Sequence, residues 1–320
     1  MRIEAEHINY TYNPGTEFAV QALKDISLTI EEGEFFGVVG HTGSGKSTFI
    51  QHLNGLILQP SAQKKYRPKK PKKGAPVPLP SVLKVGGFDL LNKKTDFRAL
   101  RSKVGMVFQY PEVQLFAETV FDDVAFGLKN FAKEPLKPEA IEEAVRSALE
   151  TVGLDYAEVK DKSPFDLSGG QKRRVAIAGV IVTRPEVLVL DEPAAGLDPL
   201  GKKELMALLH RLHADWCKTV VFVSHDMDEV AENCSRVAVF ADGQIKYVLT
   251  PRALFSKFDE LDALGLELPA AAKIARLLHE EGIDIESDFT PDDFAEKAAA
   301  YLSARLGQTE KTEKGEGGEA

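Results

Sequence analysis

A short apolar run that ends in a glycine-rich turn limits the fold of this chain more than any other feature. The run is FFGVVG at residues 35–40, and it leads directly into GHTGSGKST at residues 40–48. An apolar run that stops at glycine is typical of a buried parallel strand. The turn fits the pattern G-x-x-x-x-G-K-[ST], which needs a strand before it and a helix after it. The sequence therefore predicts a phosphate-binding loop on an α/β sheet.

The residues of this loop indicate its chemistry. Gly43 and Gly45 leave room for backbone N–H groups to approach phosphate oxygens, and the helix that follows adds the positive end of its dipole. Lys46 would reach the β- and γ-phosphates, and the Ser47 hydroxyl would bind Mg²⁺. We therefore expect a site for ATP. The predicted ATP-binding residues of the loop are Gly40, Thr42, Gly43, Ser44, Gly45, Lys46, Ser47 and Thr48.

Two more apolar runs end in polar residues. They are VLVLDEP at 187–193 and TVVFVSHD at 219–226, and the amphipathic stretch GKKELMALLHRLHADW lies between them. This strand–helix–strand alternation predicts parallel strands in one sheet. Asp191, at the carboxyl end of its strand, is placed to hold Mg²⁺ through water. Glu192 beside it could polarise the attacking water.

The remaining segments differ in periodicity and composition. Residues 59–81 are rich in proline and lysine, which predicts a surface loop. The other predicted segments are strands at 3–12, 22–30 and 82–90, mainly helices at 96–165, a hairpin at 236–249, helices at 251–306 and a disordered tail at 307–320.

Overall composition excludes several classes of protein. The formal net charge of −9 argues against a general nucleic-acid binder, whose affinity depends on neutralising phosphates. Cys217 and Cys234 are too few for a disulfide framework or a metal cluster, and we expect both to be reduced thiols. No apolar run approaches the ~20 residues that a membrane-spanning helix needs.

A second glycine-rich stretch, DLSGGQKRR at 166–174, also begins a predicted helix. Its exposed N–H groups and helix dipole would suit an anion. LSGGQ is the signature of ABC-type ATPases, and the chain resembles that family over about residues 3–250. The resemblance implies that the signature loop of one subunit lies on the γ-phosphate held by the other, so that two ATP sites form in a head-to-tail dimer. The residues expected to act on the partner's ATP are Ser168, Gly169, Gly170, Gln171 and Asp198.

Other family motifs fall at matching places. Tyr12 matches the aromatic residue that stacks on adenine, with Tyr10 as the alternative. Gln109 in GMVFQYPE matches the glutamine that contacts Mg²⁺ and the attacking water. His225 in VSHD matches the histidine that hydrogen-bonds the γ-phosphate and positions Glu192. The implied catalytic residues are Lys46, Gln109, Glu192 and His225, and the implied Mg²⁺ ligands are Ser47, Gln109 and Asp191.

The resemblance also implies a P-loop NTPase fold of the ABC ATPase type. Within residues 1–250 it implies an N-terminal antiparallel β subdomain, a parallel-sheet core and a helical signature subdomain at about 96–180. Residues 251–306 fit the family's helical dimerisation extension, or alternatively a cap on the chain's own domain. The predicted apolar face of this extension consists of Phe255, Phe258, Leu261 and Leu264.

The stretch VFQYPEVQLFAETVFDDVAFGLKN at 107–130, together with SHDMDEVAENCSRVAVFADGQI, resembles the ATPases of energy-coupling factor importers. These bacterial systems take up vitamins or cobalt and nickel ions. The resemblance implies a peripheral ATPase at the cytoplasmic face of the cell membrane. Its partners would be a second ABC ATPase subunit, a transmembrane coupling protein and a membrane-embedded substrate-binding component, without nucleic acid. The alternatives are an ATPase of another ABC transporter class and a soluble regulatory ABC ATPase.

Two charged segments bear on these partners. In the family, the segment after Gln109 forms the groove that receives helices of the coupling protein. Acidic side chains there could receive arginines of those helices, and the loop at 59–81 could touch anionic lipid at ~1 kcal/mol per basic residue or simply be solvated. The sequence determines neither the transported substrate nor whether the dimer is homomeric or includes a paralogue. The acidic candidates are Glu112, Glu118, Asp122 and Asp123.

Overall fold

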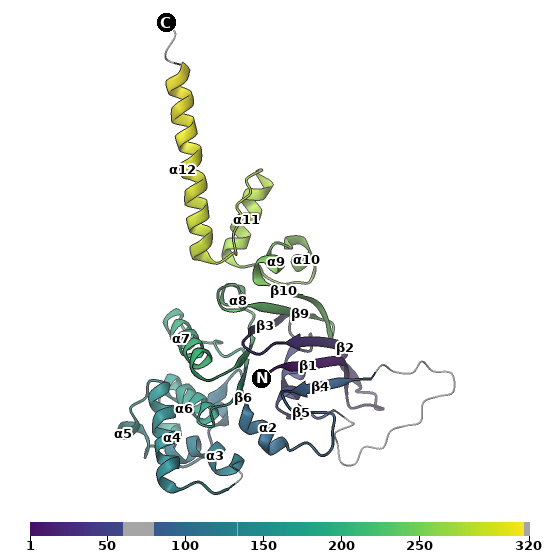
Figure 1. Cartoon of the computed structure of the whole chain (residues 1–320), viewed down its shortest axis with the longest axis vertical. Helices are drawn as coiled ribbons and strands as arrows, with labels where there is room; N and C mark the ends of the chain where they lie inside the picture. The colour runs from purple at the N-terminus through teal and green to yellow at the C-terminus, as the bar shows by residue number, and fades with distance from the viewer. Residues whose placement is uncertain (60–79, 133, 317–320) are drawn as a thin grey trace, which may run out of the picture.

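A computed structural model of the chain describes residues 1–59, 80–132 and 134–316, with side chains up to residue 305. Two sheets and a set of surrounding helices make up the fold (Figure 1). The predicted surface loop at 59–81 lies almost entirely outside the described residues, so its conformation and any lipid contact stay predictions.

The central sheet has six strands in the order β10-β9-β3-β8-β7-β6. Every neighbouring pair is parallel except β9 and β10, which form the predicted hairpin. Its strands are β3 (Phe35–Gly40), β6 (Val104–Val107), β7 (Val187–Asp191), β8 (Thr219–Val223), β9 (Arg236–Ala241) and β10 (Gln244–Leu249).

Both faces of this sheet are covered, which explains the uninterrupted apolar runs of its strands. Alternate residues of one strand enter different cores: Phe36 and Val38 of β3 pack into one, and Phe35 and Val39 into the other. Because successive side chains of a strand point to opposite faces, a doubly covered strand must be apolar throughout. The parallel sheet predicted from the apolar runs is confirmed.

An antiparallel sheet packs against one face of the central sheet. Its order is β2-β1-β4-β5, and its side chains share a core with helix α1 (Lys46–Leu53). The strands are β1 (Ile3–Tyr12), β2 (Val20–Ile30), β4 (Val82–Val85) and β5 (Phe88–Asp89). The predicted N-terminal antiparallel part is present.

The other face carries most of the helices. Val145 and Leu149, one helical turn apart, are fully buried there. These elements are α3 (Val120–Phe131), α4 (Pro138–Thr151), α5 (Tyr156–Val159), η3 (Pro164–Asp166), α6 (Gly169–Ile181), α7 (Pro199–Asp215) and α8 (Met227–Asn233).

One strand contradicts the mainly helical prediction for residues 96–165. Between α2 (Phe97–Lys103) and the short η2 (Pro111–Gln114) lies β6, the edge strand of the parallel sheet. Its four residues, VGMV, are all buried and pair with β7 through Val104 and Val187. So short a run shows no periodicity, and only its pairing with a strand 83 residues later makes it a strand.

The C-terminal part is helical, as predicted. Phe255 and Leu261 are buried and Phe258 and Leu264 are partly buried, all against the chain's own core. These contacts fit the capping alternative, and a dimerisation role stays a proposal. The helices are α9 (Pro251–Phe255), α10 (Phe258–Ala263), α11 (Ala270–Glu280) and α12 (Pro291–Glu316), of which α11 and α12 project away from the body (Figure 1).

Helix α12 continues to Glu316, where the sequence predicted a disordered tail from residue 307. The helix therefore extends into the first ten residues of the predicted tail. Glutamate, lysine and glutamine make a segment polar but are also good helix formers, so polar composition alone does not separate a tail from a helix extension. None of the helices in the described ranges is long and apolar enough to cross a bilayer.

Candidate functional site

The predicted phosphate loop connects β3 to α1 through glycines with positive φ. Gly40 has φ 150°, Gly43 81° and Gly45 104°. A Cβ at Gly40 would lie 2.2 Å from the carbonyl oxygen of Phe240, and one at Gly45 would lie 2.6 Å from that of Ala22. Gly45 is the N-cap of α1 and offers no side-chain acceptor, so the first N–H groups of the helix stay available to an anion.

Replacing Gly40 with alanine should therefore destabilise the folded protein by at least about 2 kcal/mol, because backbone strain and overpacking combine there. Gly43→Ala is the matched control: its added Cβ meets nothing within 4 Å, so only the left-handed conformation costs free energy, about 1–2 kcal/mol. Urea unfolding of both variants measures the difference. Equal losses would show that the close approach to Phe240 has no effect.

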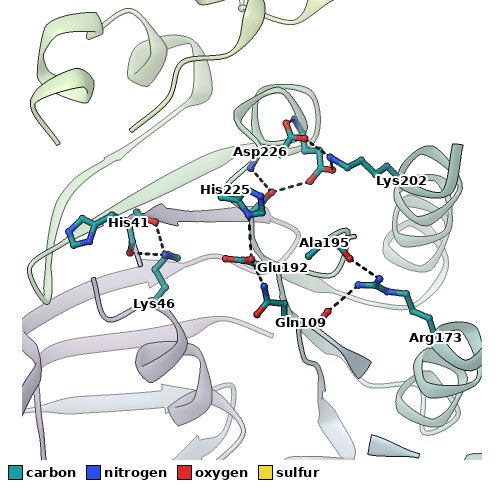
Figure 2. Close-up of polar contacts among 12 residues, drawn as sticks. His41, Lys46, Gln109, Arg173, Glu192, Ala195, Lys202, His225 and Asp226 are labelled. Carbon is teal, nitrogen blue, oxygen red and sulfur yellow. Dashed lines mark hydrogen bonds and ion pairs between the residues drawn. The ribbon is translucent and has the colours of Figure 1, made fainter. Parts of the chain in front are cut away.

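Lys46 is buried at the start of α1. Its Nζ donates to the carbonyl oxygens of Gly40 at 2.6 Å and His41 at 3.0 Å (Figure 2). Burial lowers the pKa of this ammonium group, while the nearby carboxylates of Glu192 and Asp191 act in the opposite direction. The cation is thus held inside the loop by backbone oxygens, ready to exchange them for phosphate oxygens.

Ser47 and Asp191 meet where Mg²⁺ was expected. Burial raises the pKa of the Asp191 carboxyl group, and the nearby Ser47 hydroxyl partly offsets the rise. A hydroxyl and a partly buried carboxylate are hard oxygen donors of the kind that Mg²⁺ prefers, and a bound cation would relieve the burial of the charge. These two residues therefore fit the ion.

Glu192 receives two side chains that are distant in sequence. Gln109 Nε2 donates to Glu192 Oε2 at 2.9 Å, and His225 Nδ1 lies 3.3 Å from the same oxygen (Figure 2). Glu192 has φ 49°, in the left-handed region that residues with a side chain rarely adopt, and its N–H donates to Val223 of β8 at 2.9 Å. Strained backbone of this kind persists where surrounding structure enforces it, and it clusters at functional sites.

The residues predicted to act in trans lie on the surface. Ser168, Gly169 and Gly170 are exposed at the start of α6, where Ser168 and Gln171 form a capping box. Asp198 is exposed too, and it caps α7 by accepting from the Gly201 N–H at 2.7 Å. Nothing lies within 4 Å of a Cβ built at Gly169 or Gly170. Backbone N–H groups at this helix start are thus open to a ligand from outside the chain.

The two adenine candidates differ in exposure. Tyr12 is 36% exposed, and its hydroxyl hydrogen-bonds with that of Thr48 at 3.2 Å, next to the phosphate loop. Tyr10 is half-buried between Tyr12 and His52, with edge-to-face ring contacts at 4.9 Å to each. Tyr12 offers the freer ring face.

Arg173 is a residue of this region that sequence reasoning missed. From α6 it donates to the carbonyl oxygens of Ala195 at 2.9 Å and Gln109 at 3.1 Å. Burial lowers the pKa of its guanidinium group, and Glu112 acts in the opposite direction. It therefore joins the signature helix to the segments that carry Gln109 and Asp198. The available signal was an arginine two residues after LSGGQ, in the first turns of the predicted helix.

Together, the loop at the end of β3 and the carboxylates at the end of β7 define an ATPase of the P-loop class. Its exposed second glycine loop is the mark of the ATP-binding cassette. The family model described as ABC transporter matches residues 23–195.

Individual relatives narrow this class. An energy-coupling factor transporter ATP-binding protein EcfA2 of Symbiobacterium thermophilum is 48% identical over 308 residues, covering 96% of this chain and 99% of the relative. One of the same name from Caldanaerobacter subterraneus is 43% identical over 303 residues, covering 94% and 98%. The chain belongs to the ABC transporter ATPases and, within them, to the energy-coupling factor transporter ATP-binding proteins.

Solved structures agree with this assignment. That of cbiO1 from Clostridium perfringens, part of the ABC transporter complex cbiONQ, is 34% identical, with a TM-score of 0.65 and coverage of 86% of this chain and 98% of that one. A dimeric post-hydrolysis state of the ATP-binding cassette MJ0796, bound to ADP and Pi, is 26% identical, with a TM-score of 0.63 and coverage of 78% and 98%. The predicted ABC ATPase fold is confirmed.

Proposed function

We propose that this chain is the ATP-hydrolysing subunit of an importer of the energy-coupling factor type, and that it works at the cytoplasmic face of the membrane. The observation that carries the hydrolytic mechanism is the placement of Glu192 between Gln109 and His225 at the end of β7. The ATP chemistry follows from that geometry together with Lys46.

ATP would bind with its phosphates along the loop from Gly40 to Thr48. Lys46 would leave the carbonyl oxygens of Gly40 and His41 for the β- and γ-phosphates. Mg²⁺ held by Ser47, Asp191 and Gln109 would neutralise charge on the phosphates. Adenine would stack on the aromatic ring of Tyr12, which is exposed.

Glu192 would orient the attacking water and accept its proton, as a carboxylate beside the γ-phosphate can do. Gln109 and His225 both contact Oε2, which leaves Oε1 for the water. The side chain of His225 is 69% exposed. Its ring could therefore also reach the γ-phosphate of ATP bound at the phosphate loop. Holding one carboxylate oxygen at two points fixes the direction in which the other receives the proton.

A second ABC ATPase subunit, identical or paralogous, would complete each site. The start of α6 carries no acidic residue in its first turn, and its exposed glycines present N–H groups with the positive end of the helix dipole. A γ-phosphate on the partner's loop fits that surface. Asp198 would cross the same interface, and ATP binding would close the two subunits.

The surface between α2, η2 and α3 is the proposed seat of the coupling protein. A cavity of about 410 Å³ lies there, lined by residues that include Phe116 and Phe126. These rings are 59% and 45% exposed and meet edge to face at 4.9 Å. A half-exposed aromatic pair in a cleft suits an apolar helix face.

Two of the four acidic candidates near this cleft already have partners within the chain. Asp123 is buried and accepts the N–H groups of Phe116 and Ala117 at 2.9 Å each, so it holds the loop before α3. Asp122 pairs with Lys129 at 2.9 Å. Glu118, which is exposed, is the better candidate to receive an arginine of the coupling protein, because Glu112 already faces Arg173 and its Oε2 is buried.

Phe126→Asn should weaken capture of the coupling protein by at least about tenfold, because an aromatic anchor in a cleft carries much of an interface's free energy. ATP binding should stay at the wild-type value, since the side chain lies away from the phosphate loop. Leu136→Asn, which alters a 41% exposed leucine outside the cleft, is the control. Co-purification from detergent-solubilised membranes measures capture, and equal capture by all three proteins would remove the cleft as the docking site.

The whole proposal is tested by purifying the tagged chain from solubilised native membranes and identifying its companions. A small polytopic protein together with a second ABC ATPase supports the importer. Different membrane subunits would indicate another transporter class. Soluble companions alone would indicate a regulatory ATPase and overturn the transport proposal while leaving the hydrolytic residues in place.

A further inference from the structure

The turn that carries His225 is enclosed by a ring of polar contacts. Ser224 Oγ donates to Glu229 Oε2 at 3.0 Å, and the Asp226 N–H donates to Ser224 Oγ at 3.0 Å. Lys202 Nζ closes the ring, at 2.7 Å from Asp226 Oδ2 and 3.3 Å from Glu229 Oε1 (Figure 2). The residues on both sides of His225 are therefore held, while its imidazole extends outward to Glu192.

Lys202 is the member of this ring that comes from another element. It lies in the first turn of α7, where its N–H donates to the carbonyl oxygen of Asp198 at 2.9 Å. Asp198 caps that same helix through the Gly201 N–H. A single side chain thus joins the Asp198 loop, which is proposed to face a partner subunit, to the turn of His225, which is proposed to face this subunit's own γ-phosphate.

Electrostatics explains why a lysine stands there. A cation in the first turn of a helix is disfavoured by the helix dipole, so α7 itself gains nothing from Lys202. Lys202 is instead stabilised by the carboxylates of Asp226 and Glu229, which lie close together at the start of α8. Glu229 is buried. The hydrogen bond with Asp226 raises the pKa of Lys202. Burial raises the pKa of Asp226, but the bonds from Lys202 and from the N–H groups of α8 outweigh it and the pKa is lowered.

We propose that Lys202 is a positioning residue that sets His225 against Glu192 and couples this turn to Asp198 at the subunit interface. It touches neither ATP nor the attacking water. Movement of the Asp198 loop on dimer closure would pull α7, and Lys202 would transmit that movement through Asp226 to His225. This inference rests on the hydrolytic roles of His225 and Glu192 proposed above.

The test compares Lys202→Met with Lys203→Met in the complete complex with its partner ATPase. Lys203 is exposed and adjacent on the same helix, so the two variants lose the same charge from the same turn. We expect Lys202→Met to lower kcat about tenfold or more, as small displacements of a catalytic group do, with KM and equilibrium ATP binding within about twofold of wild type. Lys203→Met should match wild type in all three.

Two further variants separate positioning from folding. Lys202→Arg can still bond both carboxylates and should recover most of kcat, and Asp226→Asn keeps a cap for α8 while removing the charge that Lys202 pairs with. If Lys202 and Asp226 act as a pair, adding Lys202→Met to the Asp226→Asn variant should lower kcat little further. Thermal unfolding identifies a variant that fails for structural reasons.

His225→Ala distinguishes the outcomes. If it abolishes hydrolysis while Lys202→Met behaves like Lys203→Met, the positioning role is overturned and the proposed function stands. If His225→Ala hydrolyses ATP at the wild-type rate, the role of His225 falls and that of Lys202 falls with it. A joint loss of kcat, ATP binding and melting temperature in Lys202→Met, without recovery in Lys202→Arg, would assign Lys202 to stability alone.

Discussion

Glu192→Gln should lower the rate of ATP hydrolysis by about 10²-fold or more, the size of effect that general-base catalysis contributes, while ATP still binds. The amide has the shape of the carboxylate and can keep its contacts with Gln109 and His225, which lie 2.9 and 3.3 Å from Oε2. It cannot accept the proton of the attacking water. The variant should therefore accumulate with ATP bound and its subunits closed.

Phosphate release measures the lost turnover, and size-exclusion chromatography with ATP and Mg²⁺ measures the closed dimer. Glu186→Gln is the matched control, because Glu186 directly precedes β7 and pairs with Lys103 at the opposite end of that strand from Glu192. It should hydrolyse ATP normally. Substantial remaining turnover in Glu192→Gln would remove Glu192 as the base.

Lys46→Ala should weaken ATP binding by about 100-fold, the equivalent of losing hydrogen bonds from a charged donor. The ammonium group is buried and is held by the Gly40 and His41 carbonyl oxygens at the base of the loop. Lys46 supplies the positive charge of the phosphate loop. Without it, no cationic side chain of the loop would contact the ATP phosphates. Hydrolysis at subsaturating ATP should fall with binding.

Equilibrium titration with a fluorescent ATP analogue measures this loss. Lys24→Ala is a control on the neighbouring strand β2, outside the phosphate loop. Unchanged melting of the ATP-free Lys46→Ala protein would show that the loop still folds. Tight ATP binding by the variant would contradict the assignment of the phosphate loop.

Some features of the site follow from residues that are close together in the sequence. The phosphate loop needs glycine at positions where φ is positive and a Cβ would collide with neighbouring backbone, and Gly40 and Gly45 both meet that condition. The apolar runs of β7 and β8 predicted parallel strands because a sheet covered on both faces admits no alternation. Ser168 and Gln171, three residues apart, form their capping box within a single turn of helix.

Other features depended on partners far along the chain. β6 is a strand because it pairs with β7, which its four residues cannot reveal. Asp123 resembled an exposed acidic residue until the structure placed it beneath the N–H groups of Phe116 and Ala117. Polar composition likewise failed to separate the end of α12 from a disordered tail.

The sequence by itself thus determined what nearest neighbours decide: the turn at the phosphate loop, the buried strands and the order of the catalytic motifs. The tertiary structure alone decided which distant groups meet, as in Gln109 with Glu192, the Arg173 guanidinium with the Ala195 carbonyl oxygen, and Lys202 with Asp226. The physical reason is that backbone conformation follows largely from sterics within a few residues. A contact between side chains instead depends on the packing of whole elements, and no local pattern records it.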